Sequence, residues 1–343
     1  MSGPGKLLSL LLGLLLPSLA CSHQVVILQY HHVSITTPAS TSLSPALFAR
    51  HMHYLKDNGY TVLRLEDALA AIRNGRPVPD KAVSITFDDA YRNVYTEAFP
   101  LLRELDFPFT IFISAGLVSE KPGVYASWEQ LNEMGQAGAT LANHTLTHPY
   151  LLMRAAGEDE DRWLARVRHE IVAAEEMILT RTGKSQHLLA YPYGEYNLAI
   201  QALVKELGYI GLGQQSGAVN ITSDFAALPR FPFSGTYASM KTFPVRAGSL
   251  AFNIESVIPP DRITHSGNPE ATLVLGPGDY RAEQVSCFHM NQPMQLTFEG
   301  NSITMTSTVK SSSRRFRYNC TAPAKDGRFY WYSIDWVNPS IAE

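Results

Sequence analysis

The sequence has few cysteines, no excess of positive charge and, beyond its N-terminus, no long hydrophobic run. Lys and Arg total 28 against 31 Asp and Glu, a formal net charge of −3. Without a basic tract, this balance argues against nucleic acid as a partner. No internal repeat and no long low-complexity linker are present, so the 343 residues are expected to form one large domain and a small one.

The one long apolar run has the form of an export signal. Lys6 supplies a positive charge, residues 7–16 are apolar, and residues 18–20 form a small-x-small cleavage site before Cys21. The run is too short to span a bilayer. We therefore predict a signal peptide at residues 1–20, rather than a buried helix. The protein is expected in the periplasm or outer membrane, or else secreted.

Three cysteines leave an odd one in an exported chain. Cys21 follows the cleavage site, where a bacterial lipoprotein carries its lipid, although Pro17 and Ser18 fit a lipobox poorly. Lipidation and simple secretion both stay open, and a lipid on Cys21 is the only membrane contact expected. With Cys21 set aside, Cys287 and Cys320 can form a disulfide, as oxidation is favoured outside the cell.

From residue 25 to about 235, short apolar strands alternate with amphipathic helices. This alternation predicts a parallel sheet or barrel covered by helices. One helix begins at Ser44-Pro45 and carries His51 and His53, which we expect to be solvated. Strands are predicted at 25–29, 61–63, 82–87, 109–114, 140–143, 188–191 and 210–213, and further helices near 66–73, 92–106, 127–136, 159–182 and 197–207.

After about residue 245 the helical periodicity disappears. Short runs rich in Thr, Ser and aromatic residues alternate with turn signals at 271–275, 294–298, 302–309 and 329–336. This pattern predicts an antiparallel β-sandwich of roughly ninety residues. Its stripe of Phe329, Trp331, Ile334 and Trp336 is either a sugar-stacking platform or, as is commoner for such stripes, the core.

Charged residues follow two of the predicted strands. Asp88 and Asp89 end the strand at 82–87, and His144 and His148 follow the strand at 140–143. Two carboxylates at the tip of an apolar strand need a positive partner. Two histidines and one carboxylate suffice for an open, catalytic divalent metal site, which leaves the second carboxylate as a base. The segment after His144 is expected to form one helical coil that brings His148 beside it.

Each of these motifs has an ordinary alternative. Adjacent aspartates are common in loops and helix caps, and a histidine pair at this spacing is often a solvated helix face. The order of the motifs is more specific than any one of them. In parallel sheets, chemistry collects at the carboxyl ends of the strands, where Asp88, Asp89, His31, His144 and Tyr193 all fall.

Together these motifs resemble those of the polysaccharide deacetylases, the NodB-homology group of carbohydrate esterase family four. The resemblance covers about residues 24–235 and rests on Thr86–Asp89, His144–His148 and Tyr191–Gly194. Tyr30-His31-His32-Val33 is similar to the Tyr-His-x-Val segment of the exported poly-β-1,6-N-acetylglucosamine N-deacetylases of biofilm systems. The match points to His31 rather than His32.

The resemblance implies a distorted (β/α) barrel at residues 21–240, followed by the β-sandwich at 245–343. It implies that Asp89, His144 and His148 ligate a divalent metal, zinc or alternatively nickel or cobalt. Asp88 would then take a proton from the attacking water, and His31 would protonate the leaving amine. The oxyanion would rest on the metal and on a backbone N–H, that of Tyr193.

Two departures from the family pattern bear on these roles. The family's arginine two residues before the motif proline is Ala190 here, so Asp88 needs another partner. Arg230 is one candidate, unless it forms a surface or structural ion pair. The large C-terminal hydrolase-like domain of many biofilm deacetylases is also missing, which weakens assignment to one polymer.

The sequence thus predicts an exported, metal-dependent N-deacetylase of an N-acetylated hexosamine polysaccharide, poly-β-1,6-N-acetylglucosamine or a similar one. A deacetylase or esterase of peptidoglycan or chitin-like glycans is the alternative within the same class. The alternative from another class is a non-catalytic glycan-binding lipoprotein. The complete set of Asp88, Asp89, His144, His148 and His31 argues against it.

Overall fold

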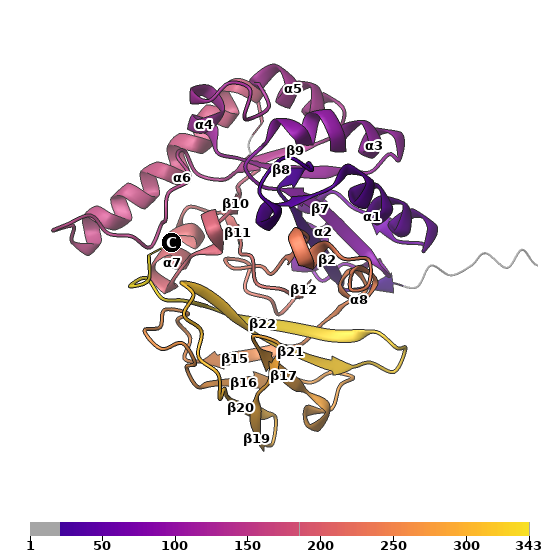
Figure 1. Cartoon of the computed structure of the whole chain (residues 1–343), viewed down its shortest axis with the longest axis vertical. Helices are drawn as coiled ribbons and strands as arrows, with labels where there is room; N and C mark the ends of the chain where they lie inside the picture. The colour runs from indigo at the N-terminus through magenta and orange to yellow at the C-terminus, as the bar shows by residue number, and fades with distance from the viewer. Residues whose placement is uncertain (1–20, 185, 343) are drawn as a thin grey trace, which may run out of the picture.

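The computed structural model describes residues 21–184 and 186–342, so the predicted signal peptide lies outside the described residues. A large helix-covered sheet is followed by two further sheets, antiparallel except where β14 pairs with β22, whose strands run from orange to yellow in Figure 1. Among the helices of the described ranges, none is both long enough and apolar enough to cross a bilayer.

The large sheet has nine strands, and its order is that of a distorted (β/α) barrel left open between β11 and β12. The strands pair in parallel except for β12, which runs antiparallel to β2 at the edge. In spatial order they are β11 (Ile210–Leu212), β10 (Leu188–Ala190), β9 (Thr140–Asn143), β8 (Phe109–Ile113), β7 (Ala82–Phe87), β2 (Gln24–Tyr30) and β12 (Ala218–Asn220), with β5 (Thr61–Val62) beside β7 and β13 (Phe231–Pro232) beside β2.

Helices connect the strands and bury both faces of the sheet. Alternate residues of β2 enter two separate cores, Val26 and Leu28 on one face and Val25 and Ile27 on the other. A strand covered on both sides must be apolar throughout, which explains the continuous runs in the sequence. The helices are α1 (Pro45–Asp57), α2 (Leu65–Arg73), α3 (Phe99–Glu104), α4 (Ala115–Glu120), α5 (Trp128–Gln136), α6 (Glu160–Thr182), α7 (Leu198–Glu206) and α8 (Phe243–Ala247).

Local signals set the helix ends, and the expected start at Ser44-Pro45 is present. The Ser44 side chain accepts a hydrogen bond from the Leu47 N–H, with Pro45 at the first helical position of α1. Ser127 and Gln130 form a capping box at the start of α5. The long helix α6 ends at Gly183, whose φ of 73° suits glycine.

The expectation that His51 is solvated is wrong. Its side chain is fully buried, with Nε2 2.8 Å from the Ala238 carbonyl and Nδ1 3.1 Å from the Tyr30 hydroxyl. Because a carbonyl only accepts, Nε2 carries the proton and Nδ1 accepts from the hydroxyl. Burial lowers the pKa of His51 to about 4, so this histidine is a neutral core residue.

The two C-terminal sheets form the predicted antiparallel β-sandwich. Leu273 and Ile303 of one sheet share a core with Tyr318, Ile334 and Trp336 of the other. Ile334 and Trp336 therefore belong to the core. One sheet has the order β14 (Leu250–Ala251), β22 (Phe329–Val337), β21 (Arg315–Pro323), β17 (Ser286–His289) and β18 (Gln292–Pro293), and the other β15 (Ile254–Ile258), β16 (Ala271–Leu275), β20 (Ser302–Thr306) and β19 (Gln295–Glu299).

A buried ion-pair cluster fixes the sandwich against the large sheet. Glu195, which follows β10, accepts from Arg314 Nε at 2.6 Å and from Arg314 Nη2 at 2.8 Å. Arg315 at the start of β21 donates to the same carboxylate at 3.0 Å. Gly217 also forms a β-bridge with Tyr332 of β22. The strand ends on this side of the large sheet therefore face β21 and β22.

The predicted disulfide is present, and it joins β17 to β21 through Cys287 and Cys320. Replacing both cysteines with alanine is expected to lower the free energy of unfolding by roughly 3–4 kcal/mol, because the bridge restricts the unfolded chain over 33 residues. Urea unfolding of the double variant measures this loss, and Cys21→Ser serves as the control without an effect. Equal stability of all three proteins would contradict the prediction.

Candidate active site

The polar residues singled out in the sequence gather at one edge of the large sheet. Asp88 and Asp89 follow β7, His144 follows β9, Tyr193 follows β10, and His31 follows β2. These strands are parallel, so their carboxyl ends meet at the same rim. The expected rim is therefore present, with all of these residues on it.

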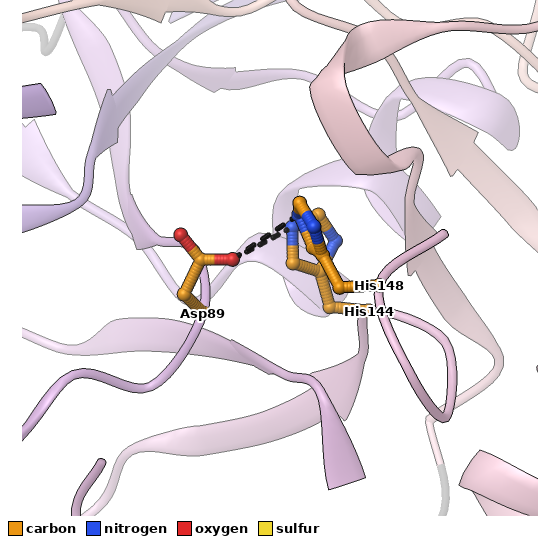
Figure 2. A group of neighbouring side chains, drawn as sticks. All are labelled: Asp89, His144 and His148. Carbon is orange, nitrogen blue, oxygen red and sulfur yellow. Dashed lines mark ion pairs between the residues drawn. The ribbon is translucent and has the colours of Figure 1, made fainter. Parts of the chain in front are cut away.

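Asp89, His144 and His148 form a compact group of metal-ligating side chains. Asp89 Oδ1 lies 3.4 Å from His144 Nε2 and 3.3 Å from His148 Nε2. The three ligand atoms all lie within 4.8 Å of one another. Figure 2 shows the carboxylate pointing toward both imidazole rings. Two imidazoles and one carboxylate on a partly exposed rim leave room for further ligands, as in catalytic sites.

The protonation of this group suits a cation. His144 Nδ1 lies 2.7 Å from the Ala190 carbonyl and so carries the proton, which leaves Nε2 as a lone-pair donor. That Nε2 is buried and has no hydrogen-bond partner among the described residues. Burial and the neighbouring His144 lower the pKa of His148 to about 4, so its ring is neutral. Although burial lowers the pKa of His144, the Asp89 carboxylate 3.4 Å from Nε2 outweighs it and raises that pKa, so a divalent metal would take the place of a proton between these two groups.

The segment between the two histidines differs from the expected helical coil. Thr145 and His148 have φ values of 67° and 57°, which no right-handed helix contains. The carboxylate of Glu170 in α6 accepts from the Thr147 N–H at 2.9 Å and from its hydroxyl at 2.8 Å. These bonds hold a loop in place of a helical turn. The two rings still meet, with centroids 4.8 Å apart.

Asp88 is fully buried and is held by a cation that directly precedes β13, the strand beside β2. Arg230 Nη1 lies 2.6 Å from Asp88 Oδ1, and Nη2 lies 2.8 Å from Oδ2. Gln29 Nε2 donates to Oδ2 at 2.6 Å. Although burial raises the pKa of Asp88, Arg230 outweighs it and lowers that pKa to about 2. Because the family's arginine is replaced by Ala190, Arg230 is the residue that pairs with Asp88 here. Asp88 therefore stays ionised.

His31, and not His32, faces Asp88. His31 Nε2 lies 3.9 Å from Asp88 Oδ2. The ring of His32 stacks on Tyr91 at 3.5 Å, and its Nδ1 accepts from Asn93 Nδ2 at 2.9 Å. The preference for His31 thus agrees with the geometry.

A family model for polysaccharide deacetylases matches residues 75–212. This stretch is similar to the polysaccharide deacetylases. The chain is 28% identical over 205 residues to the putative polysaccharide deacetylase YxkH of Bacillus subtilis, covering 60% of this chain and 69% of that protein. It is also 28% identical over 213 residues to the poly-β-1,6-N-acetyl-D-glucosamine N-deacetylase of Escherichia coli K12, covering 52% of this chain but only 31% of that enzyme.

Solved structures agree on the fold of this chain. The deacetylase PplD of Streptococcus pyogenes superposes with a TM-score of 0.56 and 25% identity, over 62% of this chain and 93% of that one. IcaB from Ammonifex degensii gives a TM-score of 0.57 at 23% identity, over 66% and 98% of the two chains. The predicted distorted barrel of NodB-homology type is therefore confirmed.

Several aromatic rings border the site, and among those described here the sequence pointed only to Tyr193. Tyr193 has a left-handed φ of 58°, and its ring lies 4.5 Å from that of His148 and stacks on Tyr150 at 4.0 Å. On the opposite side, Tyr91 stacks on Tyr125. Burial and the Asp89 carboxylate raise the pKa of Tyr91 well above its ordinary value, so its hydroxyl keeps its proton. In the sequence, only its position directly after Asp89 and Ala90 indicates that Tyr91 lies at the site.

Proposed function

We propose that this deacetylase is a metal-dependent enzyme that removes N-acetyl groups from an N-acetylhexosamine exopolysaccharide of the poly-β-1,6-N-acetylglucosamine type. The main support is one observation, the buried ionised Asp88 clamped by Arg230 beside an Asp-His-His group with an unpartnered Nε2. The curated relatives that carry this substrate in their names support the choice of glycan.

Asp89, His144 and His148 are the residues that would hold the metal. A bound divalent ion would lower the pKa of a water molecule toward about 7 and polarise the acetamide carbonyl. The electrostatic surroundings of Asp88 explain why such help is needed. Because a carboxylate with a pKa of about 2 is a weak base, Asp88 accepts a proton readily only from an acidified water.

The remaining steps fall to groups near Asp88. Water adds to the carbonyl carbon as Asp88 takes its proton, and the C–N bond then breaks to give acetate and an amine. An amine does not leave an amide as an anion, so His31, 3.9 Å from Asp88, delivers a proton to the nitrogen. The backbone N–H of Tyr193, next to His148 on the rim, stabilises the oxyanion.

Acetate release from a panel of glycans tests this function. The panel holds β-1,6- and β-1,4-linked N-acetylglucosamine oligomers and peptidoglycan, with the enzyme stripped by chelator and reloaded with zinc, cobalt or nickel. We expect metal-dependent release that is fastest on the β-1,6 series, with Asp88→Asn as the blank. Faster release from chitin oligomers or peptidoglycan would reassign the substrate. No release with any metal would favour a non-catalytic glycan-binding role.

The role of His31 predicts a dependence on the leaving group. His31→Ala is expected to lose far more activity on amide substrates than on aryl acetates, because aryl oxides leave without a proton and amines do not. Parallel kcat/KM measurements on both substrate types give the comparison, and His32→Ala is the matched control. Equal losses on amide and ester would show that His31 only positions the substrate.

The organisation of the whole chain is also part of the proposal. We infer a deacetylase domain at residues 21–240, an accessory β-sandwich at 245–343 and export by residues 1–20. Cys21 opens the exposed strand β1 (Cys21–Ser22), which is consistent with a lipid there or with secretion. Cell fractionation separates the two, because only a lipidated protein would move from the membrane to the soluble fraction in Cys21→Ser.

A further inference from the structure

A cavity of about 270 Å³ lies between the active-site rim and the sheet of the sandwich that contains β21. The rim contributes Tyr193 to its wall, and β21 contributes Arg315, Arg317 and Asn319. Neither the metal ligands nor the proposed base lines it. The cavity is therefore distinct from the reacting centre, although it is close by, since the Tyr193 ring lies 4.5 Å from the His148 ring.

The three residues of β21 belong to the face of the strand that points away from the sandwich core. Successive side chains of a strand point to opposite faces, and Tyr318 and Cys320 between and beyond them are buried in that core. Arg315, Arg317 and Asn319 are each partly exposed. Their polar groups are therefore accessible to a molecule in the cavity.

Arg317 has only neutral partners. Its Nη1 donates to the Gln214 carbonyl at 3.0 Å and to Ser216 Oγ at 3.4 Å. Within residues 21–184 and 186–342, no acidic side chain forms an ion pair with it. Burial and the neighbouring Arg315 lower the pKa of Arg317, as expected for a guanidinium that is short of negative charge.

The nearest carboxylates are engaged with other residues. Asp335 lies opposite Arg317 in the pairing of β21 with β22. Its Oδ1 nevertheless accepts from the Tyr196 hydroxyl at 3.2 Å and lies 3.9 Å from Arg262 Nε. Glu195 is already shared by two other arginines, as described above. The wall of the cavity therefore has an excess of positive charge.

Arg246 adds to this excess beside the cavity. Its Nη1 donates to the Tyr237 carbonyl at 2.7 Å, and its guanidinium lies over the Tyr237 ring at 5.3 Å. It too lacks an ion pair with any described acidic residue, and burial and Arg317 both lower its pKa. Partly buried cations without a counter-charge are costly. The usual partner of such a guanidinium is a carboxylate or a phosphate.

Other groups in the wall suit a sugar. Tyr237 lines the cavity and is 51% exposed, so its ring offers an apolar face to a pyranose. The exposed side chains of Asn291 and Ser313 also line it and offer partners for hydroxyl groups. The volume is close to the lower limit of roughly 300 Å³ for small-molecule sites, which suits one sugar unit.

We propose that this cavity binds an acidic sugar unit, one that carries a carboxylate or a phosphate group, of the same polysaccharide that is deacetylated at the metal site. Since Tyr193 borders both places, a chain bound at the metal site continues past this ring to the cavity. The β-sandwich is then part of the substrate-binding site, and Arg317 selects acidic chains. This inference rests on the proposed function and narrows its substrate to an acidic polysaccharide.

Calorimetric titration of the full chain with three sugars at millimolar concentration tests the preference for charge. The probes are glucuronate, N-acetylglucosamine 6-phosphate and neutral N-acetylglucosamine. We expect at least one acidic sugar to bind roughly tenfold more tightly than the neutral one, and the tighter of the two acids identifies the acidic group. Arg317→Gln is expected to weaken binding of that acid roughly tenfold, as for the loss of a charge-assisted hydrogen bond. Arg317→Lys, which keeps the charge, should weaken it less.

Arg281→Gln is the matched control, because it removes the same charge from an exposed position of the sandwich outside the cavity. It should keep the wild-type affinities within about twofold. Equal affinity of the wild type for acidic and neutral sugars would overturn the proposal. Acid binding that is insensitive to Arg317→Gln would also overturn it and would place the acid elsewhere, as at the metal. If Arg317→Gln fails to fold, Tyr237→Ala removes an exposed ring of the wall and should weaken acid binding instead.

Acetate release separates a failure of this inference from a failure of the proposed function. A wild type that binds an acidic sugar through Arg317 but releases no acetate from any glycan would refute the function and keep the anion site. Metal-dependent acetate release without tighter binding of either acidic sugar would keep the function and refute this inference.

Discussion

Replacing His144 with alanine is expected to abolish stoichiometric metal binding and acetate release while the chain stays folded. A site with three protein ligands rarely survives the loss of one imidazole. His144 is the most constrained of the three, because its Nδ1–H is fixed on the Ala190 carbonyl and its Nε2 has no other partner among the described residues. His148→Ala is expected to behave in the same way.

Elemental analysis of purified protein measures the metal content, and circular dichroism checks the fold. His187→Ala is the matched control, since His187 is exposed and stacks on Tyr209 away from the rim. Full metal occupancy in His144→Ala or His148→Ala would rule out the ligand set.

Asp88→Asn is expected to keep the metal and to lose roughly 10²–10⁴ in kcat, the range for removal of a general base. The neighbouring change Asp89→Asn should instead lose metal affinity, because Asp89 supplies the only carboxylate of the ligand group. The two aspartates are adjacent in sequence, yet one is paired with Arg230 and the other faces two imidazoles. Their contacts therefore assign them different roles.

Asp88→Asn also leaves the buried guanidinium of Arg230 without its counter-charge. Breaking one side of a buried ion pair costs about 3–5 kcal/mol, so kinetics must be measured well below the melting temperature of the variant. Metal content and kcat together make the comparison decisive. Equal metal affinity in Asp88→Asn and Asp89→Asn would show that the assigned roles are wrong.

The sequence was sufficient to predict which residues lie on the rim, because each of them directly follows an apolar strand. An apolar strand that ends in Asp88-Asp89 and another that ends before His144 need only parallel pairing to bring their tips together. Since helices separate the strands, parallel pairing was the expected arrangement. The disulfide could be predicted because Cys287 and Cys320 are the two cysteines that remain in an exported chain once Cys21 is set aside.

Contacts between distant segments were harder to foresee. Arg230 lies 142 residues from Asp88, and Gln29 lies 59 residues before it, so nothing in the local pattern linked them firmly. Strand β21 was not predicted because its outward side chains are charged. Arg315 and Arg317 contact the barrel while Tyr318 and Cys320 enter the sandwich core, a division of faces that only the docking of the two parts explains.

The partners of Asp88 flank the family-matched segment on both sides. Gln29 precedes residues 75–212 and Arg230 follows them, and β2, which carries Gln29, pairs directly with β7. A fragment trimmed to the matched segment would lose both partners and the strand beside β7. The Asp88 carboxylate would then be buried without a counter-charge, so we expect such a fragment to be insoluble as well as inactive. Exchange of this segment between relatives would succeed only if both flanks moved with it.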